Sequence, residues 1–303
     1  MAADPWTVYW QADHLESCVA MTSAADADVV SSVWQRFASS LQDGSAVLDL
    51  ATGNGTVPRT LLLANPSLAV TGVDQADIDP LQYLSDSTGL TNVKFMAGVD
   101  VCALPLAAES FDALTSQFGI EYAPLKRAVP ATIPLLKSGG RLLWLLHHAE
   151  SVVVRPARKK RQEMLALLQT DGTIQALIAH VQGKSSASEL ELAGKRHLES
   201  SVGRSRKVTG QIFEGVHRVL QFLENNNRTA AVTLANTMTS RLQADCERLG
   251  QLCDAAIADE KMQVIVEQLQ QAGLVHVTTD RLAVSQPSNA DEIVGWLIGG
   301  SKP

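Results

Sequence analysis

The sequence predicts an α/β protein with a doubly wound, mostly parallel sheet. Between residues 46 and 147, five short apolar runs alternate with stretches of helical periodicity, as in parallel strands joined by crossover helices. The first run leads into a turn that holds Gly53 and Gly55. The pattern becomes helical after Ser151 and returns to strands after Gly273, which favours an insertion within one α/β domain over a separate carboxyl-terminal domain.

Four segments follow in order along the chain. Residues 1–45, rich in tryptophan and tyrosine, predict an amino-terminal helical cap. Residues 46–151 form the α/β core, residues 152–258 the helical insertion, and residues 259–303 the return to the core. Within the insertion, apolar side chains recur every three or four positions from residue 231 to 253, which predicts a helix packed in a bundle or at a subunit interface. The predicted core strands are 46–50, 69–73, 93–97, 113–117 and 141–147.

Composition bounds the class of protein. The 303 residues are 46% hydrophobic and 19% charged, and no apolar run reaches the ~18 residues of a membrane span. The amino terminus lacks the layout of a secretory signal and the four cysteines form no CxxC pair, so we expect a cytoplasmic chain without a metal site. A net charge of −7 argues against a general nucleic-acid binder. Residues 151–218 are locally basic, which fits a solvated helix face or an anionic ligand.

The glycine turn predicts a bound cofactor. A strand that ends in such a turn and opens a helix brings backbone and unpaired N–H groups close to a ligand. Dinucleotides use this geometry, and so does S-adenosylmethionine. The dinucleotide pattern G-x-G-x-x-G lacks its third glycine here. Asp49 would repel a pyrophosphate but can neutralise an ammonium group, which favours S-adenosylmethionine over a nicotinamide cofactor.

Two further acids follow the next strands. Asp74 ends the second strand, where a carboxylate can accept both ribose hydroxyls. Asp100 follows the third strand and could accept from the adenine amino group, while the N–H of Val101 could donate to a ring nitrogen. Each acid alone is more often a turn former. Three acids at three consecutive strand ends predict one nucleoside site.

With these motifs the chain resembles the class I S-adenosylmethionine-dependent methyltransferases of the Rossmann-like, small-molecule type. The resemblance rests on VLDLATGNG, VTGVD, GVDVCALPLAAESFD and LLKSGGRLLWL, and covers about residues 45–150 and more loosely 259–303. It implies a seven-stranded sheet whose last strand is antiparallel, with S-adenosylmethionine at the carboxyl ends of the strands. The implied cofactor contacts are Asp49, Thr52, Gly53, Asn54, Gly55, Asp74, Gln75, Asp100, Val101, Gln117 and Tyr9.

The acceptor side is less determined. After the fourth strand the chain reads SQFGIEYAP, which departs from the Asn-Pro-Pro-Tyr signature and counts against methylation of adenine or glutamine amides. Glu121, His147 and His148 are the candidate general bases, with strand capping and core packing as the structural alternatives. Four further residues are candidates to line the acceptor or close over the cofactor, or simply to pack: Phe118, Tyr122, Trp10 and His14.

The expected function is methyl transfer to an oxygen or nitrogen atom of a small-molecule acceptor. The insertion leaves the end of the fifth strand, so we expect it to act as a lid that selects the acceptor, and a homodimer through it is a further expectation. Methylation of tRNA or protein, motivated by the basic insertion, stays open as an alternative. So does a non-catalytic scaffold that binds the cofactor. Aminopropyl transfer would require a more acidic acceptor pocket than the sequence identifies.

Overall fold

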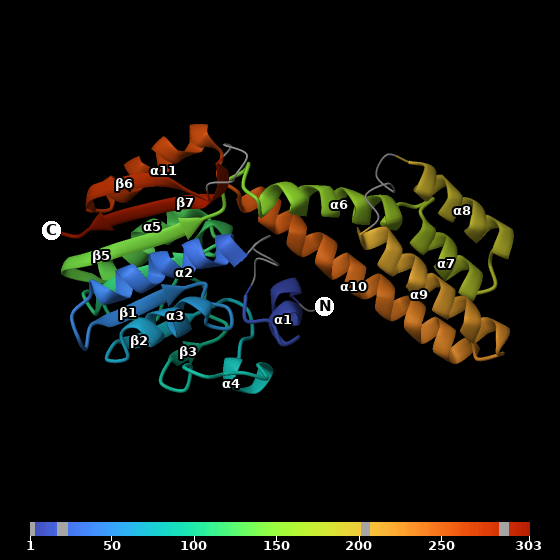
Figure 1. The fold of residues 1–303 in the computed structure, drawn as a ribbon, viewed down its shortest axis with the longest axis horizontal. Coiled ribbons are helices and arrows are strands. Elements are labelled where there is room, and N and C mark those ends of the chain that lie inside the picture. Colours follow the sequence, from blue (N-terminus) through green and yellow to red (C-terminus); the bar gives the residue numbers. More distant parts are fainter. Residues whose placement is uncertain (1–3, 17–23, 201–206, 285–290) are drawn as a thin grey trace. The chain divides into compact units, whose positions relative to one another are not determined.

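The structure is a computed structural model that describes residues 4–16, 24–200, 207–284 and 291–303. The chain divides into two compact units, Met1–Arg155 with Asp254–Pro303, and Pro156–Cys253 (Figure 1). Within the described ranges, no helix has both the length and the apolar character to cross a membrane. The helices of the α/β part are α1 (Pro5–Trp10), α2 (Ala24–Ser39), α3 (Thr56–Ala64), α4 (Pro80–Tyr83), α5 (Leu125–Thr132) and α11 (Asp259–Gln271).

One sheet of seven strands, in the order β3-β2-β1-β4-β5-β7-β6, organises the first unit. The pairs among β1 to β5 are parallel, and β7 is antiparallel to both of its neighbours. This confirms the doubly wound sheet with an antiparallel last strand. The strands are β1 (Ala46–Leu50), β2 (Ala69–Val73), β3 (Lys94–Met96), β4 (Phe111–Gln117), β5 (Leu136–Leu146), β6 (Val275–Val284) and β7 (Glu292–Ser301).

The strand order reverses between β1 and β4, and this position directs the search for a site. The chain continues from β1 towards β2 on one side and returns to place β4 on the other side of β1. In open α/β sheets, ligands bind outside the carboxyl ends of the strands where the order reverses. The glycine turn after β1 and the segment after β4 therefore flank the expected binding position.

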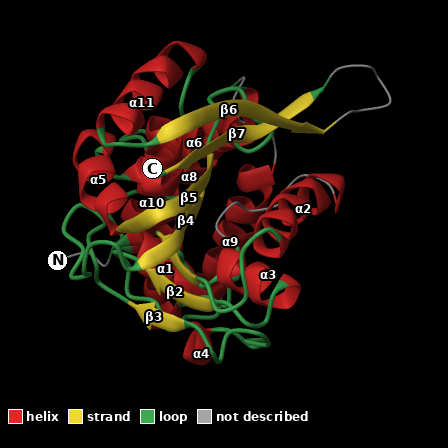
Figure 2. Cartoon of the chain, turned by 90° about the vertical axis from the view of Figure 1, so that its left-hand side faces the viewer, coloured by secondary structure: helices red, strands yellow, loops and turns green. Residues whose placement is uncertain are grey.

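Helices cover both faces of the sheet. Figure 2 shows the sheet between α5 and α11 on one side and α2 and α3 on the other. Leu48 and Leu50 of β1 are fully buried and belong to the apolar cluster that includes Ile265 of α11. Because alternate residues of a strand point to opposite faces, Asp49 lies on the other face, the side of α2 and α3.

Strand β5 differs from its predicted bounds of 141–147. It begins at Leu136, because Leu136 pairs with Phe111 before a bulge shifts the register to Ala113 and Arg141. The intervening residues include Gly139 with a φ of +76°. Glycine and charged residues are depleted in strands, so the sequence pattern did not include this edge. Strand β3 is also shorter than the predicted 93–97.

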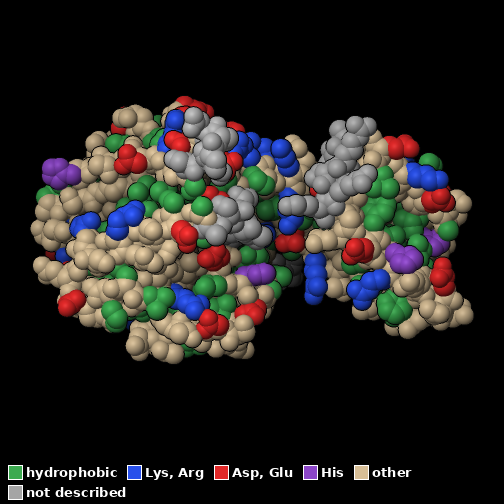
Figure 3. Space-filling model, viewed as in Figure 1, with side chains coloured by type: hydrophobic (Ala, Val, Ile, Leu, Met, Phe, Trp, Pro, Cys, Tyr) green, Lys and Arg blue, Asp and Glu red, His purple; other side chains and the backbone are tan. Residues whose placement is uncertain are grey.

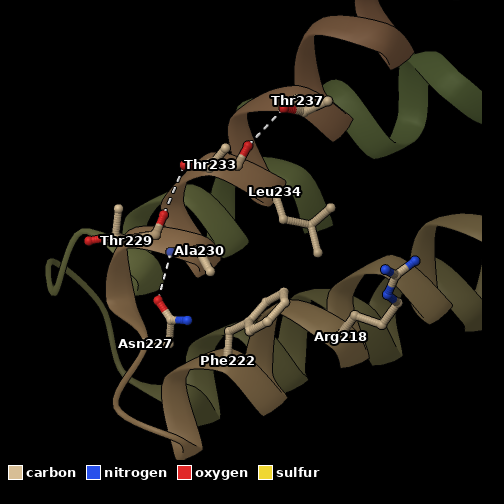
Figure 4. Close-up of a pocket in the computed structure, with 8 residues that line it drawn as sticks. All are labelled: Arg218, Phe222, Asn227, Thr229, Ala230, Thr233, Leu234 and Thr237. Atoms are coloured by element: carbon tan, nitrogen blue, oxygen red, sulfur yellow. Dashed lines mark hydrogen bonds between the residues drawn. The ribbon is translucent and has the colours of Figure 1, made fainter.

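The second unit is helical in its described parts. Its core includes Leu177, Val219 and Ala235, all fully buried or nearly so. A groove of about 510 Å³ lies between α9 (Lys207–Glu224) and α10 (Arg228–Ala255), where Phe222 and Leu234 face one another (Figure 4). The hydroxyls of Thr233 and Thr237 donate to carbonyls of their own helix, so these side chains present methyl groups. The helices are α6 (Val154–Leu168), α7 (Thr173–Val181), α8 (Ala187–Glu199), α9 (Lys207–Glu224) and α10 (Arg228–Ala255).

Candidate functional site

Three residues of the turn after β1 have a left-handed backbone conformation. Ala51, Gly53 and Gly55 have φ values of +53°, +53° and +89°. Gly55 is also the N-cap of α3 and makes no side-chain hydrogen bond there. A Cβ atom at Gly53 would lie 2.3 Å from the indole ring of Trp10, so a planar group rests directly against this glycine. The glycines at both positions are required by conformation, and at Gly53 by close approach as well.

Two buried carboxylates flank this turn. Asp49, 1% exposed, accepts a hydrogen bond of 2.7 Å from the hydroxyl of Thr115. Asp74, 8% exposed, accepts from the N–H groups of Gly53 and Ala76, at 2.8 Å each. Burial raises the pKa of Asp49 to about 6 and that of Asp74 to about 6, and the charge of Asp74 adds to the shift of Asp49. The turn is therefore held in place by the acid of the neighbouring strand.

The third acid has a different environment. Asp100 accepts the N–H of Cys102 at 2.8 Å and lies 3.9 Å from the guanidinium of Arg127, with its side chain 45% exposed. This is the geometry of a turn former at the end of β3. Val101 is buried in the core, and Gln75 is exposed. The expected contacts of Asp100, Val101 and Gln75 with the cofactor stay predictions.

Helix α1 is fixed to the glycine turn. Asn54 is fully buried, and its side-chain N–H group donates to the carbonyls of Trp10 at 2.9 Å and His14 at 2.8 Å. The hydroxyl of Thr56 donates to the carbonyl of Leu15 at 2.6 Å. Tyr9 is buried and its ring stacks on His14, with 4.2 Å between centroids. The structure thus brings Tyr9, Trp10 and His14 next to the turn, and their closure over the cofactor stays a prediction.

The carboxyl ends of β4 and β5 form the other half of the site. The side-chain carbonyl of Gln117 accepts from the indole N–H of Trp34 at 2.5 Å. Phe118 has a φ of +51° and stacks on His147, with ring centroids 4.5 Å apart. Glu121 lies in the 3-10 helix Ile120–Tyr122 and accepts the backbone N–H of His147 at 2.8 Å.

A family model described as "Methyltransferase domain" matches residues 47–140. This stretch contains the glycine turn, both buried acids and the segment after β4. Residues 47–140 belong to the methyltransferase domain family. The resemblance read from the sequence is thereby confirmed over this part of the chain, and S-adenosylmethionine is the methyl donor of that family.

A curated relative and several solved structures are similar to this chain. A demethylmenaquinone methyltransferase of Thermotoga maritima is 36% identical over 100 residues, and the match covers 33% of this chain and 42% of the relative. The chain thus spans less than half of that relative's length. A putative methyltransferase in complex with the Trm112 activator of Haloferax volcanii is 14% identical over the full length of both chains, with a TM-score of 0.46. A putative S-adenosylmethionine-dependent methyltransferase of Methanococcus maripaludis is 11% identical over 93% of this chain and 89% of that chain, with a TM-score of 0.46.

Buried polar atoms at the turn of the methyltransferase domain fit the methyl donor. The side-chain oxygen of Asn54 is buried and has no hydrogen-bond partner within the described ranges, so it can accept from an ammonium group. Asp49, buried four residues before Gly53 on β1, can supply the countercharge. A Cβ at Gly53 would lie 2.3 Å from Trp10, so the lack of a side chain there is what lets a planar ring lie against the turn.

The two histidines that follow β5 differ in their surroundings. Both ring nitrogens of His148 are engaged: Nε2 lies 2.9 Å from a carboxylate oxygen of Asp259, and Nδ1 accepts the N–H of Glu150 at 3.0 Å. This arrangement joins the end of β5 to α11. His147 is fully buried, and burial lowers its pKa to about 3, so its ring is neutral near pH 7. The hydroxyl of Tyr122 lies 3.3 Å from Nε2 of His147.

Some neighbours of these residues were absent from the sequence prediction. Trp34 donates a hydrogen bond to Gln117, and Thr115 donates one to Asp49. Trp6 packs edge-on against Tyr122, with 5.2 Å between ring centroids. Thr115 could have been found, since it stands on the neighbouring strand in register with Asp49. The contacts of Trp6 and Trp34 join distant parts of the chain, and no spacing in the sequence indicates them. Among the described residues, no group of three or more His, Cys, Asp or Glu could hold a metal ion.

The raised pKa of Asp49 predicts a stabilising substitution. Folding raises its pKa from 3.8 to about 6, so the folded chain holds more protons than the unfolded chain between those values. The contribution of Asp49 to stability is therefore complete below about pH 4 and is lost as the pH rises through 6. We expect Asp49→Asn to raise the melting temperature of the cofactor-free protein most at pH 7.5 and less at pH 5, where only part of the contribution has been lost.

Thermal unfolding of variant and parent at several pH values checks this expectation. His147 has the opposite effect, because its lowered pKa costs stability as the pH falls. The quantity to follow is therefore the difference in melting temperature between variant and parent at each pH. An equal difference at pH 5 and pH 7.5 would contradict the burial of an ionised Asp49.

Proposed function

We propose that the chain transfers a methyl group from S-adenosylmethionine to an oxygen or nitrogen atom of a small-molecule acceptor. The observation that carries this proposal is the pair of buried carboxylates, Asp49 and Asp74, on either side of a glycine turn in a methyltransferase domain. The bound donor supplies a methyl carbon on a positively charged sulfur. The chain must hold this group, exclude water from it and present the acceptor in line.

Different residues of the chain would bind the donor, exclude water and accept a proton. Asp74 and the N–H groups at the start of α3 would hold the nucleoside and the carboxylate of the donor, and Asn54 with Asp49 would hold its ammonium group. Tyr9 and Trp10 are buried over the turn and would exclude water. Glu121 has its pKa raised to about 7 by burial, so it can take a proton from an acceptor near neutral pH.

The helical insertion is the proposed source of acceptor specificity. The chain leaves β5 at His147 and returns beside it, since Ile257 exchanges backbone hydrogen bonds with His147 and Ala149. Residues 152–258 therefore begin and end at the carboxyl end of β5. We propose that they select the acceptor and pair two subunits; light scattering of the purified chain tests the second point.

The face of the molecule in Figure 3 supports a small acceptor over a nucleic acid. Lys and Arg side chains on this face are interspersed with Asp and Glu on both units, rather than gathered in one stripe. Recognition of a phosphate backbone uses a continuous basic surface. The basic stretch of α6 keeps tRNA or protein as the second candidate acceptor.

Calorimetry tests the proposed cofactor, and product analysis tests the transfer. We expect S-adenosylmethionine and its demethylated product to bind at micromolar levels while NAD does not. Incubation with small acceptors, tRNA and protein should then release the demethylated product only with a small acceptor. Tight NAD binding would overturn the proposal, and cofactor binding without transfer to any acceptor would favour a scaffold.

A further inference from the structure

Aromatic rings line the carboxyl ends of β4 and β5. The ring of Trp6 meets that of Tyr122 edge-on at 5.2 Å. Tyr122 meets His147 at 5.9 Å, and His147 stacks on Phe118 at 4.5 Å. The face of an aromatic ring is electron-rich and attracts an organic cation. This row of rings therefore favours a flat or cationic ligand over an anionic one.

Glu121 adds a negative charge beside the same rings. It is 6% exposed, and its Oε1 accepts the backbone N–H of His147. Its second oxygen, Oε2, is buried and has no hydrogen-bond partner within the described ranges. No lysine or arginine among the described residues forms an ion pair with Glu121, and burial raises its pKa to about 7. A ligand with an N–H group and a positive charge would supply both missing partners.

We propose that the acceptor is an amine, held in its ammonium form by Glu121 and the ring of Tyr122, and methylated on nitrogen. This rests on the proposed methyl transfer and narrows its acceptor to one chemical class. A carboxylate or phosphate in the same position would face Glu121 without a compensating cation. An alcohol could donate one hydrogen bond but would gain nothing from the ring faces.

The chemistry of the step is consistent with this assignment. The ammonium first loses a proton to Glu121, which leaves a lone pair on nitrogen. That lone pair forms the N–C bond as the S–C bond of the donor breaks, and the electron pair of the broken bond stays on sulfur. The nitrogen becomes a methylated ammonium and the sulfur a neutral thioether. The proton on Glu121 passes to water when the product leaves.

Binding of a non-reactive cation tests the recognition by itself. Choline carries a fixed positive charge, and 3,3-dimethylbutan-1-ol has the same shape without the charge. With the demethylated cofactor product saturating, we expect choline to bind at least ~10-fold more tightly than the alcohol. Glu121→Gln should remove most of that preference, since it keeps the acceptor for the N–H of His147 but loses the charge. Glu150→Gln removes a charge from an exposed position near the end of β5 and should leave the preference intact.

Turnover tests the chemistry with three acceptors of similar size. We expect 2-phenylethylamine to be methylated with a kcat/KM at least ~10-fold above that of 2-phenylethanol, and 3-phenylpropionate to be inert. Glu121→Gln should lower kcat/KM for the amine at least ~10-fold without changing the affinity for S-adenosylmethionine. Retained cofactor affinity also shows that the variant is folded.

The outcomes separate the two proposals. Absence of S-adenosylmethionine binding by the parent protein would overturn the proposed function itself. Normal cofactor binding with equal affinity for choline and its uncharged analogue, or with preferred turnover of the alcohol or the carboxylate, would overturn the amine assignment alone. If none of the three acceptors turned over, the choline comparison would still decide it.

Discussion

Asp74→Ala is expected to abolish measurable binding of S-adenosylmethionine. The substitution removes the proposed acceptor of the ribose hydroxyls. It also leaves the buried N–H groups of Gly53 and Ala76 without the partners that they have at 2.8 Å. Each unsatisfied buried donor costs about 1–3 kcal/mol, so the turn loses its defined conformation as well. Calorimetry should show at least a ~100-fold loss of affinity, which corresponds to about 2.8 kcal/mol.

Two variants control for this result. Asp28→Ala removes an exposed acid from α2 and should bind the cofactor as the parent does. Asp74→Asn keeps the shape and one acceptor oxygen but turns an N–H donor towards an N–H donor, so we expect an intermediate loss. An Asp74→Ala protein with parental cofactor affinity would contradict the proposed site.

Gly53→Ala is expected to displace helix α1 and to weaken cofactor binding at least ~10-fold. The added Cβ would lie 2.3 Å from the ring of Trp10, and the backbone is at a φ of +53°, where a side chain costs about 1–2 kcal/mol. The free energy of unfolding should fall by more than this conformational cost alone. Denaturant unfolding and tryptophan fluorescence measure the two effects.

Gly44→Ala provides a matched control for the backbone cost. Gly44 has a φ of +78°, and a Cβ there would meet no atom within 4 Å. Its substitution should therefore lower stability by the conformational cost without moving α1. Combining Gly53→Ala with Trp10→Ala completes a double-mutant cycle. In the Trp10→Ala background, Gly53→Ala should cost less stability because the clashing ring is gone. Equal losses of stability for Gly44→Ala and Gly53→Ala would contradict the expected clash with Trp10, because they would mean that its ring moves aside at no cost.

Local patterns were sufficient to predict the first strand and the glycine turn that follows it. The run into Gly53 and Gly55, and the acid four residues before, are short-range features. The seven-stranded sheet with its antiparallel last strand was expected from the resemblance to the methyltransferase family, and the structure has it. The edge of β5 was missed because the bulge opposite Phe111 is set by pairing and leaves no mark in local composition. The pairing of Trp34 with Gln117 joins residues 83 apart in the chain and was equally hidden.

The sequence could not distinguish the two adjacent histidines. His147 and His148 have the same residue type, and only the fold assigns one to the aromatic row and the other to Asp259. Strand alternation predicts that neighbours point to opposite faces, but it does not say which face holds a partner. The distinct surroundings of Asp100 were hidden in the same way, since a turn former and a ligand-binding acid look alike before the chain folds.

The attachment of α1 to the glycine turn bears on the speed of the catalytic cycle. Asn54, Thr56 and Gly53 each contact the segment of residues 10–15, so we expect release of the spent cofactor to require that these contacts open. Product escape would then set the turnover number, and the rate would fall as solvent viscosity rises while the chemical step stays unaffected. A shortened amino-terminal segment would bind the donor less tightly and exchange spent cofactor for new donor faster.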